Sequence, residues 1–448
     1  MDQLANMTRR GNISRNHLRS KKKSVTESGE ACCYLNLAPA YQSVGEYDKA
    51  KEHLEKALAI NKEIGDRNGE ADCYVNLGAV YGSVGEYDKA REHLEKSLPI
   101  KKQIGDRNGE ATCYGNLGAV NISVGEYDKA RNHFEKSLVI RKEIGDRKGE
   151  AHCYINLGIV RLSVGEYDKA RELLEISLAI TQQIGDRNGV GNCYANLGTL
   201  YRLVGEYYKT KEHFEKSLVI RKEIGDRKGE ANSYKDLGTV YFSLGEYDKA
   251  REHLEKSLAI TKQIGDRNGE SSCYLNLGAA YGSVGEYDKA REHLKKSLGT
   301  KKQIGDRNGE ADCYENLGTV YQSVGEYDKA REHFKKSLAI KKQIGDRNGE
   351  AACYRNLGTV YSSVGEYDKA RELLEKSLAI KNQIGDRKGE AGCYENLGTV
   401  YLSVGEYDKA REHLEKSLII RKETGDRNGE SYTELPKPWS CVHISWRI

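Results

Sequence analysis

Residues 311–350 read ADCYENLGTVYQSVGEYDKAREHFKKSLAIKKQIGDRNGE, and this stretch of 40 residues decides the fold. The same pattern recurs without insertion or deletion from Ala31 to Glu430. A fixed period of roughly 20 to 50 residues is the sequence signature of repeat architectures. The sequence therefore predicts one array of ten repeats rather than several independent domains, at residues 31–70, 71–110, 111–150, 151–190, 191–230, 231–270, 271–310, 311–350, 351–390 and 391–430.

Each repeat contains two helical patterns that glycine separates. Residues 308–324 and 326–344 both carry apolar side chains at spacings of three and four, which is the period of a helix. Gly325 and Gly345 are placed to end these two helices, and Asp346 is placed to cap the next one. Neither helix has an apolar face wide enough to be stable alone. We therefore expect an all-α solenoid in which each helix hairpin packs on its neighbours.

The core positions of the repeat resemble a known family. The pattern Tyr314-x2-Leu317-Gly318-x2-Tyr321, followed by Ala330-x3-Phe334, resembles the tetratricopeptide repeat signature W-x2-L-G-x2-Y…A-x3-F. Tyr replaces the leading Trp, the usual closing Pro is absent, and the unit has 40 residues instead of about 34. The resemblance covers most of the chain and implies a right-handed superhelix of ten helix-turn-helix hairpins.

The linker between repeats indicates a narrower resemblance. Forty-residue units joined by GDR-x-GE look like the arrays of the G-protein-signalling modulators LGN and Partner of Inscuteable, and of tetratricopeptide repeat protein 28. This resemblance implies a scaffold that binds protein or peptide ligands in its concave groove. It also implies a cytoplasmic location, at the cell cortex for the LGN group.

Charge and motif content argue against other classes of function. Residues 1–28 hold seven Lys/Arg and two acidic residues and read as a disordered basic leader, so the repeats themselves are close to neutral. A near-neutral body lacks the basic stripe that nucleic-acid binding requires. The sequence has no nucleotide-binding loop, no nucleophile with a placed base and no metalloprotease motif. We therefore expect neither an enzyme nor a cofactor, and no small-molecule substrate, nucleic-acid partner or membrane span.

Cysteine and histidine recur at fixed positions of the repeat. The cysteines could form a metal or disulfide ladder, or fill small apolar sites beside the core tyrosines. We favour the second interpretation, because packed helices lie about 8–10 Å apart, too far for equivalent cysteines to bridge. The histidines precede a core Leu or Phe, and we expect them to be partly exposed rather than metal ligands. The cysteines are Cys33, Cys73, Cys113, Cys153, Cys193, Cys273, Cys313, Cys353 and Cys393, and the histidines include His93, His133, His213, His253, His293 and His333.

One polar position in the first helix has a plausible binding role. By resemblance to the family, this side of the helix lines the concave groove. An amide carries a donor and an acceptor, so a row of asparagines can hold a peptide backbone without reading its sequence. Alternatively, these asparagines bridge neighbouring first helices, or simply descend from copying. The predicted groove residues are Asn76, Asn116, Asn156, Asn196, Asn276, Asn316, Asn356 and Asn396.

Two neighbouring positions vary while the rest of the repeat does not. We hypothesise that they set the sequence preference of the groove, with mostly apolar groups in the first five repeats and charges in the later ones. The alternative is drift at exposed sites. One position contributes Ile155, Lys235, Glu315, Arg355 and Glu395, and the other contributes Leu162, Arg202 and Phe242.

Three substitutions in the early repeats are expected to weaken the array. Asn121 and Arg161 replace a tyrosine at a core-type position, where a polar side chain is unfavourable unless it finds partners or reaches water. We expect this to be the softest region. Pro99 falls inside the second helix of its repeat and is expected to interrupt it.

The C-terminal residues depart from the repeat. Residues 431–448 include Trp439 and Trp446, whereas a solenoid usually ends in a polar capping helix. Either this irregular tail folds back over the last hairpin, or the chain is a fragment of a longer product, and we favour the fragment. This leaves a second function open, in which the chain is a structural spacer or assembly array that self-associates through an uncapped C-terminal end.

Overall fold

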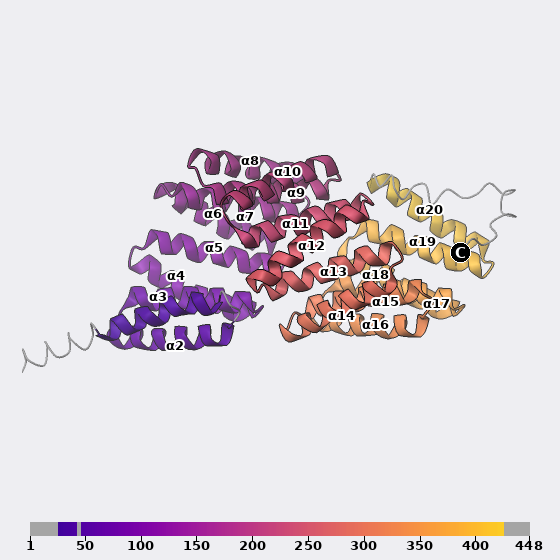
Figure 1. Cartoon of the computed structure of the whole chain (residues 1–448), viewed down its shortest axis with the longest axis horizontal. Coiled ribbons are helices and arrows are strands. Elements are labelled where there is room, and N and C mark those ends of the chain that lie inside the picture. The colour runs from indigo at the N-terminus through magenta and orange to yellow at the C-terminus, as the bar shows by residue number, and fades with distance from the viewer. Residues whose placement is uncertain (1–25, 43–45, 425–448) are drawn as a thin grey trace, which may run out of the picture. The chain divides into compact units, whose positions relative to one another are not determined.

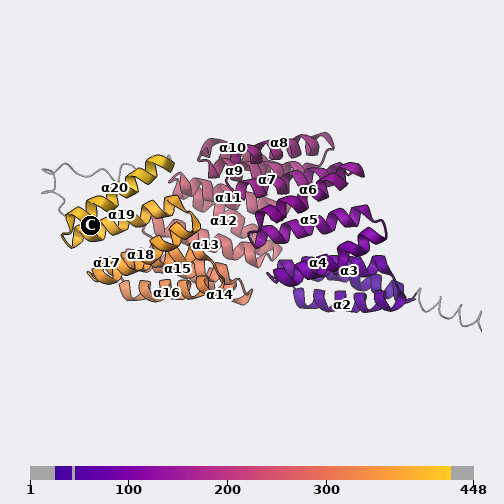
Figure 2. The same ribbon diagram turned by 180° about the vertical axis from the view of Figure 1, so that it is seen from behind.

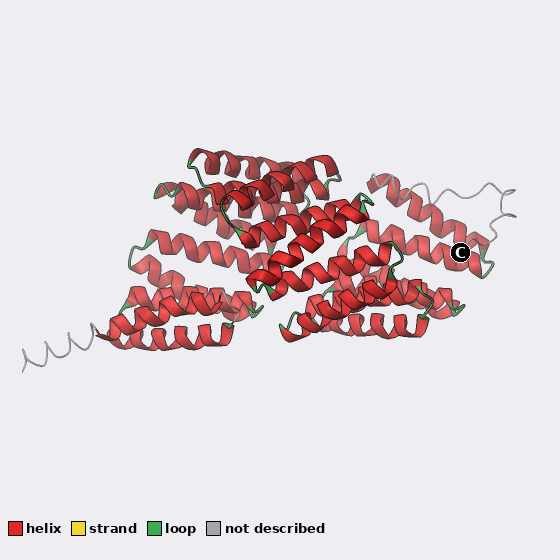
Figure 3. Cartoon of the chain, in the orientation of Figure 1, coloured by secondary structure: helices red, strands yellow, loops and turns green. Residues whose placement is uncertain are grey.

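The computed structural model describes residues 26–42 and 46–424, and within these ranges all regular secondary structure is helical (Figure 3). Of the predicted basic leader, only residues 26–28 are described, and they belong to a helix over residues 26–42. The predicted irregular tail, 431–448, lies outside the described residues. The chain divides into two compact units, Met1–Gly225 and Asp226–Ile448.

Unit 1 is a stack of helix hairpins (Figure 1). Within each repeat the first helix packs on the second, and the second packs on the first helix of the next repeat. After the helix over 26–42, its helices are α2 (Tyr47–Ile64), α3 (Arg67–Ser83), α4 (Tyr87–Gln103), α5 (Arg107–Ser123), α6 (Tyr127–Glu143), α7 (Arg147–Ser163), α8 (Tyr167–Gln183), α9 (Arg187–Leu203) and α10 (Tyr207–Glu223).

Unit 2 repeats the same arrangement, and its paired helices can be followed from both sides of the molecule (Figures 1 and 2). Its helices are α11 (Arg227–Ser243), α12 (Tyr247–Ile264), α13 (Arg267–Ser283), α14 (Tyr287–Gln303), α15 (Arg307–Ser323), α16 (Tyr327–Gln343), α17 (Arg347–Ser363), α18 (Tyr367–Ile384), α19 (Arg387–Ser403) and α20 (Tyr407–Thr424). In the described residues, no helix is both long and apolar enough to cross a membrane.

The turns between helices form as the sequence predicts. Gly325 and Gly345 have φ angles of 77° and 75°, a left-handed conformation that glycine adopts without steric cost. The Asp346 carboxylate accepts a hydrogen bond from the Gly349 amide at 2.8 Å, which caps α17. The predicted helices over 308–324 and 326–344 are therefore confirmed as α15 and α16, with ends shifted by one residue.

The core of each hairpin depends on a close approach between its two helices. Gly318 of α15 faces the Phe334 ring of α16, and a Cβ atom at residue 318 would lie 2.7 Å from that ring. Phe334 is buried among Leu317 and Val320 of its own hairpin and Leu357 of the next one. One side chain therefore holds both the hairpin and the joint to its neighbour.

First helices of successive repeats also touch each other directly. In unit 1, α3 contacts α5, α5 contacts α7, and α7 contacts α9. In unit 2, α11 contacts α13, and the series continues through α15 and α17 to α19. We call the surface formed by α3, α5, α7 and α9 the first-helix face of unit 1, and the surface formed by α11, α13, α15, α17 and α19 that of unit 2.

The expected weak points are better accommodated than the sequence suggested. Asn121 is buried, but it accepts a hydrogen bond from Arg91 at 3.3 Å and donates one to His133 Nδ1 at 2.9 Å. Arg161 extends to Glu166, with its Nη1 at 2.5 Å from the carboxylate. The polar groups at this position are thus partnered, so the reason for expecting softness does not hold.

The prediction that Pro99 interrupts its helix is wrong. The helix α4 runs through Pro99 to Gln103 and is as long as its counterpart α6. Pro99 is exposed, and Glu95, whose carbonyl loses its amide partner, is exposed as well. Water can therefore replace the missing hydrogen bond, which removes the main reason for a break.

Candidate functional site

The repeated cysteines lie in the core. Cys313 donates a hydrogen bond to Ser297 Oγ at 3.2 Å, and Ser297 donates to the Ser271 carbonyl at 2.8 Å. This chain of two bonds links α15, α14 and α13. Burial raises the pKa of Cys313 to about 11, although the bond to Ser297 lowers it. The expected burial is confirmed from Cys73 to Cys393, whereas Cys33 is exposed.

This difference predicts selective alkylation. Cys32 and Cys33 are exposed, whereas Cys313 and Cys353 are buried with pKa values raised to about 11. The thiolate is the nucleophile, and burial both lowers the thiolate fraction of the buried cysteines and blocks access to them, so they should react at least about tenfold more slowly. Mass spectrometry after a timed iodoacetamide pulse measures these rates. Equal labelling of Cys33 and Cys313 in the folded protein would contradict the burial.

The repeated histidines are partly exposed, as expected, but they pack on tyrosines. The His333 ring lies 5.9 Å from the Tyr314 ring and 5.0 Å from the Tyr321 ring, between centroids. Its Nδ1 bonds to the Lys329 carbonyl at 2.8 Å, so Nδ1 carries the proton. In the described part of the chain, no three His, Cys, Asp or Glu side chains are arranged to hold a metal ion. The structure therefore gives these histidines a packing role.

A buried cation near the end of the second helix was missed by the sequence analysis. The Lys341 amino group is almost fully buried and lies 2.8 Å from Asp312, 3.0 Å from Asp346 and 2.6 Å from Asn308 Oδ1. Burial acts to lower the pKa of Lys341, but the two aspartates outweigh it and raise the pKa. Because Asp346 caps α17, this lysine ties three helices together. A signal was available, since Lys101 and Asp72 have the same spacing as Lys341 and Asp312.

The asparagines of the predicted groove lie half-buried on the first-helix faces. Some are already engaged within the chain. Asn196 and Asn316 each donate to a carbonyl of their own helix at 2.9 Å, and Asn356 donates to Glu315 Oε1 at 2.9 Å, linking α17 to α15. The bridging alternative therefore applies to Asn356. Within the described residues, no hydrogen bond reaches the side chains of Asn76, Asn116, Asn156, Asn276 or Asn396.

The variable positions beside these asparagines differ in their surroundings. Ile155 is buried in a cluster with Leu174 and Leu197, so it contributes to the core rather than to a surface. Glu315 is held by Asn356, and burial raises its pKa. Glu395 pairs with Arg421 at 2.5 Å. The remaining predicted residues are half-buried, namely Lys235, Arg355, Leu162, Arg202 and Phe242.

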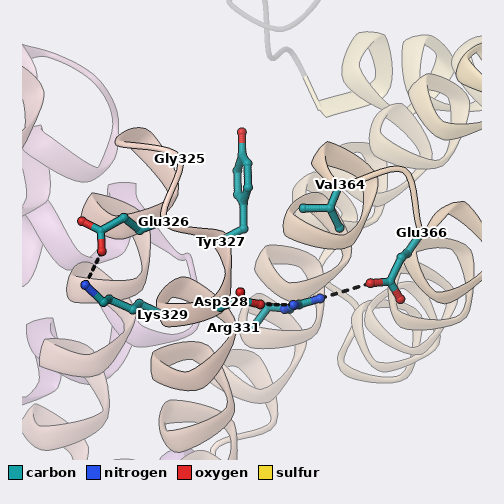
Figure 4. A pocket seen from close by; sticks show the side chains of 8 residues that line it. All are labelled: Gly325, Glu326, Tyr327, Asp328, Lys329, Arg331, Val364 and Glu366. Atoms are coloured by element: carbon teal, nitrogen blue, oxygen red, sulfur yellow. Dashed lines mark hydrogen bonds and ion pairs between the residues drawn. The ribbon is translucent and has the colours of Figure 1, made fainter.

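A pocket of about 410 Å³ lies between two helix turns in unit 2 (Figure 4). Figure 4 shows Arg331 between Asp328 and Glu366, and Lys329 paired with Glu326. The Arg331–Glu366 pair, at 3.2 Å, joins successive hairpins. Since the charged groups in this pocket already pair with each other, we interpret it as a joint rather than a ligand site.

Comparisons with known proteins address the repeat directly. Two family models, both described as tetratricopeptide repeat, match the chain. One matches residues 29–103, 109–183, 150–223, 189–263, 230–303, 270–343 and 309–383, and the other matches residues 391–424. A search of curated protein sequences finds no match.

Solved structures with the same fold have low sequence identity. A signal transduction ATPase with numerous domains and a tetratricopeptide repeat sensor, from Pyrococcus horikoshii, is 17% identical with a TM-score of 0.54, covering 81% of this chain and 55% of that one. The apo quorum sensor NprR from B. thuringiensis is 16% identical with a TM-score of 0.54, covering 76% and 98%. The apo form of RapI is 17% identical with a TM-score of 0.52, covering 62% and 99%. At these identities the likeness supports the fold alone.

Proposed function

Because the chain belongs to the tetratricopeptide repeat family, we propose that it is a protein-interaction scaffold that binds an extended peptide segment of a partner protein. The observation that carries the proposal is the set of three unengaged amides at Asn76, Asn116 and Asn156. These residues occupy the same position on α3, α5 and α7, which contact each other in series. They therefore offer a regular row of donors and acceptors on the first-helix face of unit 1.

The spacing of this row suits an extended backbone. Packed helices lie about 8–10 Å apart, and an extended chain rises about 3.3 Å per residue, so successive asparagines would meet about every third residue of a peptide. An amide can pair with a backbone carbonyl and a backbone N–H at once. Val75 and Gly115, which precede Asn76 and Asn116, carry no polar side chain, and this favours peptides with apolar side chains. Asn196 of the same unit, and Asn316 and Asn356 of unit 2, already donate within the chain.

The narrower role we propose is that of an adaptor of the G-protein-signalling or cell-polarity type. Its support is the resemblance of the 40-residue units and their GDR-x-GE linker to the LGN group. The same resemblance supports a cytoplasmic or cortical location. We keep the self-associating array as the alternative function, and light scattering across a range of protein concentrations separates the two, since a peptide-binding scaffold need not self-associate.

The test is selection of ten-residue peptides from a phage-displayed library on the purified chain. The variant Asn76→Ala/Asn116→Ala/Asn156→Ala should bind the selected peptides at least about tenfold more weakly, because each lost hydrogen bond contributes about 0.5–1.5 kcal/mol. The matched control is Asn196→Ala/Asn316→Ala, whose amides already bond to their own helices. Fluorescence anisotropy measures the affinities, and circular dichroism checks that the variants stay helical.

Two results would overturn the proposal. One is a library selection that enriches no peptide. The other is an enriched peptide that the triple variant and the control bind as tightly as the unmodified chain, which would place the binding surface elsewhere.

A further inference from the structure

In most repeats the first core tyrosine of the first helix is covered by a lysine from the preceding repeat. The amino groups of Lys62, Lys102 and Lys142 each lie 5.3 Å from the ring centroid of the tyrosine twelve residues later. The same contact recurs in unit 2, at 5.3 Å for Lys262 and Lys302 and 5.1 Å for Lys342. At this distance a cation is attracted to the face of an aromatic ring.

The covering lysine also approaches a carboxylate. Lys102 lies 4.0 Å from Glu110, Lys302 lies 3.9 Å from Glu310, and Lys342 lies 3.9 Å from Glu350. These glutamates are buried, and each pairs with the arginine three residues before it. The lysine therefore lies close to both the tyrosine and the glutamate at the start of the first helix. We call these three side chains the closed group, because the lysine covers the tyrosine ring.

Both charged members of this group are missing around Tyr194. Gln182 stands where most repeats have the covering lysine, and Val190 stands where they have the glutamate. Asn382 also replaces that lysine, but its repeat keeps the glutamate as Glu390. In place of the closed group, unit 1 has a pocket of about 660 Å³ lined by Gln182, Val190 and Tyr194. Arg187 has no glutamate three residues later, but it pairs with Glu223 as Arg107 pairs with Glu143.

The pocket lining has an excess of carboxylates. Its charged groups are Arg187 from α9 and Lys216, Glu212, Glu215 and Glu223 from α10, a net charge of −1. Lys216 pairs with Glu212 at 2.6 Å and lies 5.5 Å from the Tyr194 ring centroid, as Lys136 lies 5.6 Å from that of Tyr114. In the described part of the chain, Glu215 pairs with Lys211 alone, at 3.8 Å. Val219 and Ile220 complete the lining with apolar surface. The pocket thus combines an aromatic ring, aliphatic walls and excess negative charge.

We propose that this pocket binds a lysine side chain of a partner polypeptide. The incoming ammonium group takes the place over Tyr194 that Lys102 takes over Tyr114, and its aliphatic stem packs on Val190 and Val219. Glu215, in the lining of the same pocket, supplies a carboxylate whose ion pair with Lys211 is long, at 3.8 Å. The precedent for the ligand is the covering lysine of most other repeats. This inference therefore does not depend on peptide binding by the asparagines of the first-helix face.

The test compares two probes, Nα-acetyl-lysine methylamide and Nα-acetyl-norleucine methylamide, which share the aliphatic stem but differ in charge. Methyl NMR signals of Val219 and Ile220 report binding to the full chain. We expect the lysine probe to shift these signals and to bind at least about tenfold more tightly than the norleucine probe.

Two variants sharpen the test. Gln182→Lys/Val190→Glu restores the closed group found in most repeats, so it should fold at least as stably as the unmodified chain and lose at least about 90% of the lysine-probe affinity. Lys302→Gln/Glu310→Val opens the equivalent group at Tyr314, and the Ile340 methyl signal should then respond to the lysine probe. The proposal is overturned if the norleucine probe binds equally well, if the closing variant keeps its affinity, or if the opening variant stays folded but unresponsive.

Discussion

Phe334→Ala is expected to lower the free energy of unfolding of unit 2 by about 3–5 kcal/mol. Phe334 is 1% exposed, and its ring fills the space above Gly318 and reaches Leu357 of the next hairpin. Removing the ring therefore leaves a cavity at a joint as well as inside a hairpin. Urea unfolding followed by circular dichroism gives the total loss, and hydrogen exchange of α15, α16 and α17 locates it.

The chain supplies its own control for this variant. Leu94 and Leu254 occupy the position of Phe334 in other repeats, so Phe334→Leu should lose less than about 1.5 kcal/mol. Gly318→Ala should lose about 1–3 kcal/mol, because its Cβ would meet the ring at 2.7 Å. A leucine would obstruct this Cβ as well, since a Cβ at Gly238 would lie 2.7 Å from Leu254. Gly318→Ala/Phe334→Ala removes the obstacle and should therefore lose less than the sum of the single variants. Additive losses, or a loss below about 1 kcal/mol for Phe334→Ala, would contradict this packing.

Lys341→Thr is expected to lower the free energy of unfolding by about 2 kcal/mol. The variant leaves Asp312 and Asp346 facing each other without the cation that now lies within 3.0 Å of both. Breaking a fully buried ion pair costs about 3–5 kcal/mol. We expect the smaller loss of about 2 kcal/mol here because both carboxylates are about one-third exposed to solvent. Denaturant unfolding at neutral pH measures the loss.

The repeat at 231–270 provides a matched rescue. There Thr261 stands in the place of Lys341, and Asn232 stands in the place of Asp312. Lys341→Thr/Asp312→Asn reproduces that combination and removes one of the facing carboxylates. It should therefore recover at least about half of the lost stability. A double variant as unstable as the single one would show that the loss comes from packing of the lysine stem rather than from charge.

The pH dependence of the Lys341 variant has a definite sign. Burial acts to raise the pKa of Asp346, but the Gly349 amide and Lys341 outweigh it, so the folded-state pKa lies below its ordinary value. The stability that Asp346 contributes is therefore present above about pH 4 and is lost as the pH falls through the folded pKa. The Lys341 pKa is raised, so its contribution is present below about pH 10 and is lost at higher pH. The difference in free energy of unfolding between the Lys341→Thr variant and the unmodified chain should be constant from about pH 5 to 9, and it should become smaller below and above this range.

The sequence predicted the helices because one local pattern is copied without change. The signals for the helices are local in sequence: apolar spacings of three and four, Gly325 at the turn and Asp346 at the cap. Each affects only residues close to it in the chain, so its effect can be predicted from a single repeat. The buried cysteines followed from the same reasoning. Lys341 was missed because its three partners lie 33 residues earlier, 29 residues earlier and five residues later, and only the folded hairpin brings them together.

The candidate site was only partly accessible to such reasoning. The position of the asparagines on the first helix could be predicted from the helical period. Which amides are engaged could not, since Asn356 bonds to Glu315, a residue of the preceding repeat. Ile155 was expected on a binding surface because its position varies among repeats. It is buried because α9 covers it, a contact between repeats that the pattern of a single repeat does not contain.

Because the Asp-capped turn and the Ser–Cys hydrogen bonds recur, nearly every repeat makes the same contacts with the repeat before it and the repeat after it. Removing or adding a whole 40-residue repeat would therefore bring together surfaces that are already complementary. The gene can thus change length by recombination between its repeats, and no new interface is needed. Individual copies can then diverge while the others keep the stack intact. The pair Gln182 and Val190 is such a divergence. It is confined to one repeat, and the neighbouring repeats still pack on that repeat without the lysine and glutamate that it lacks.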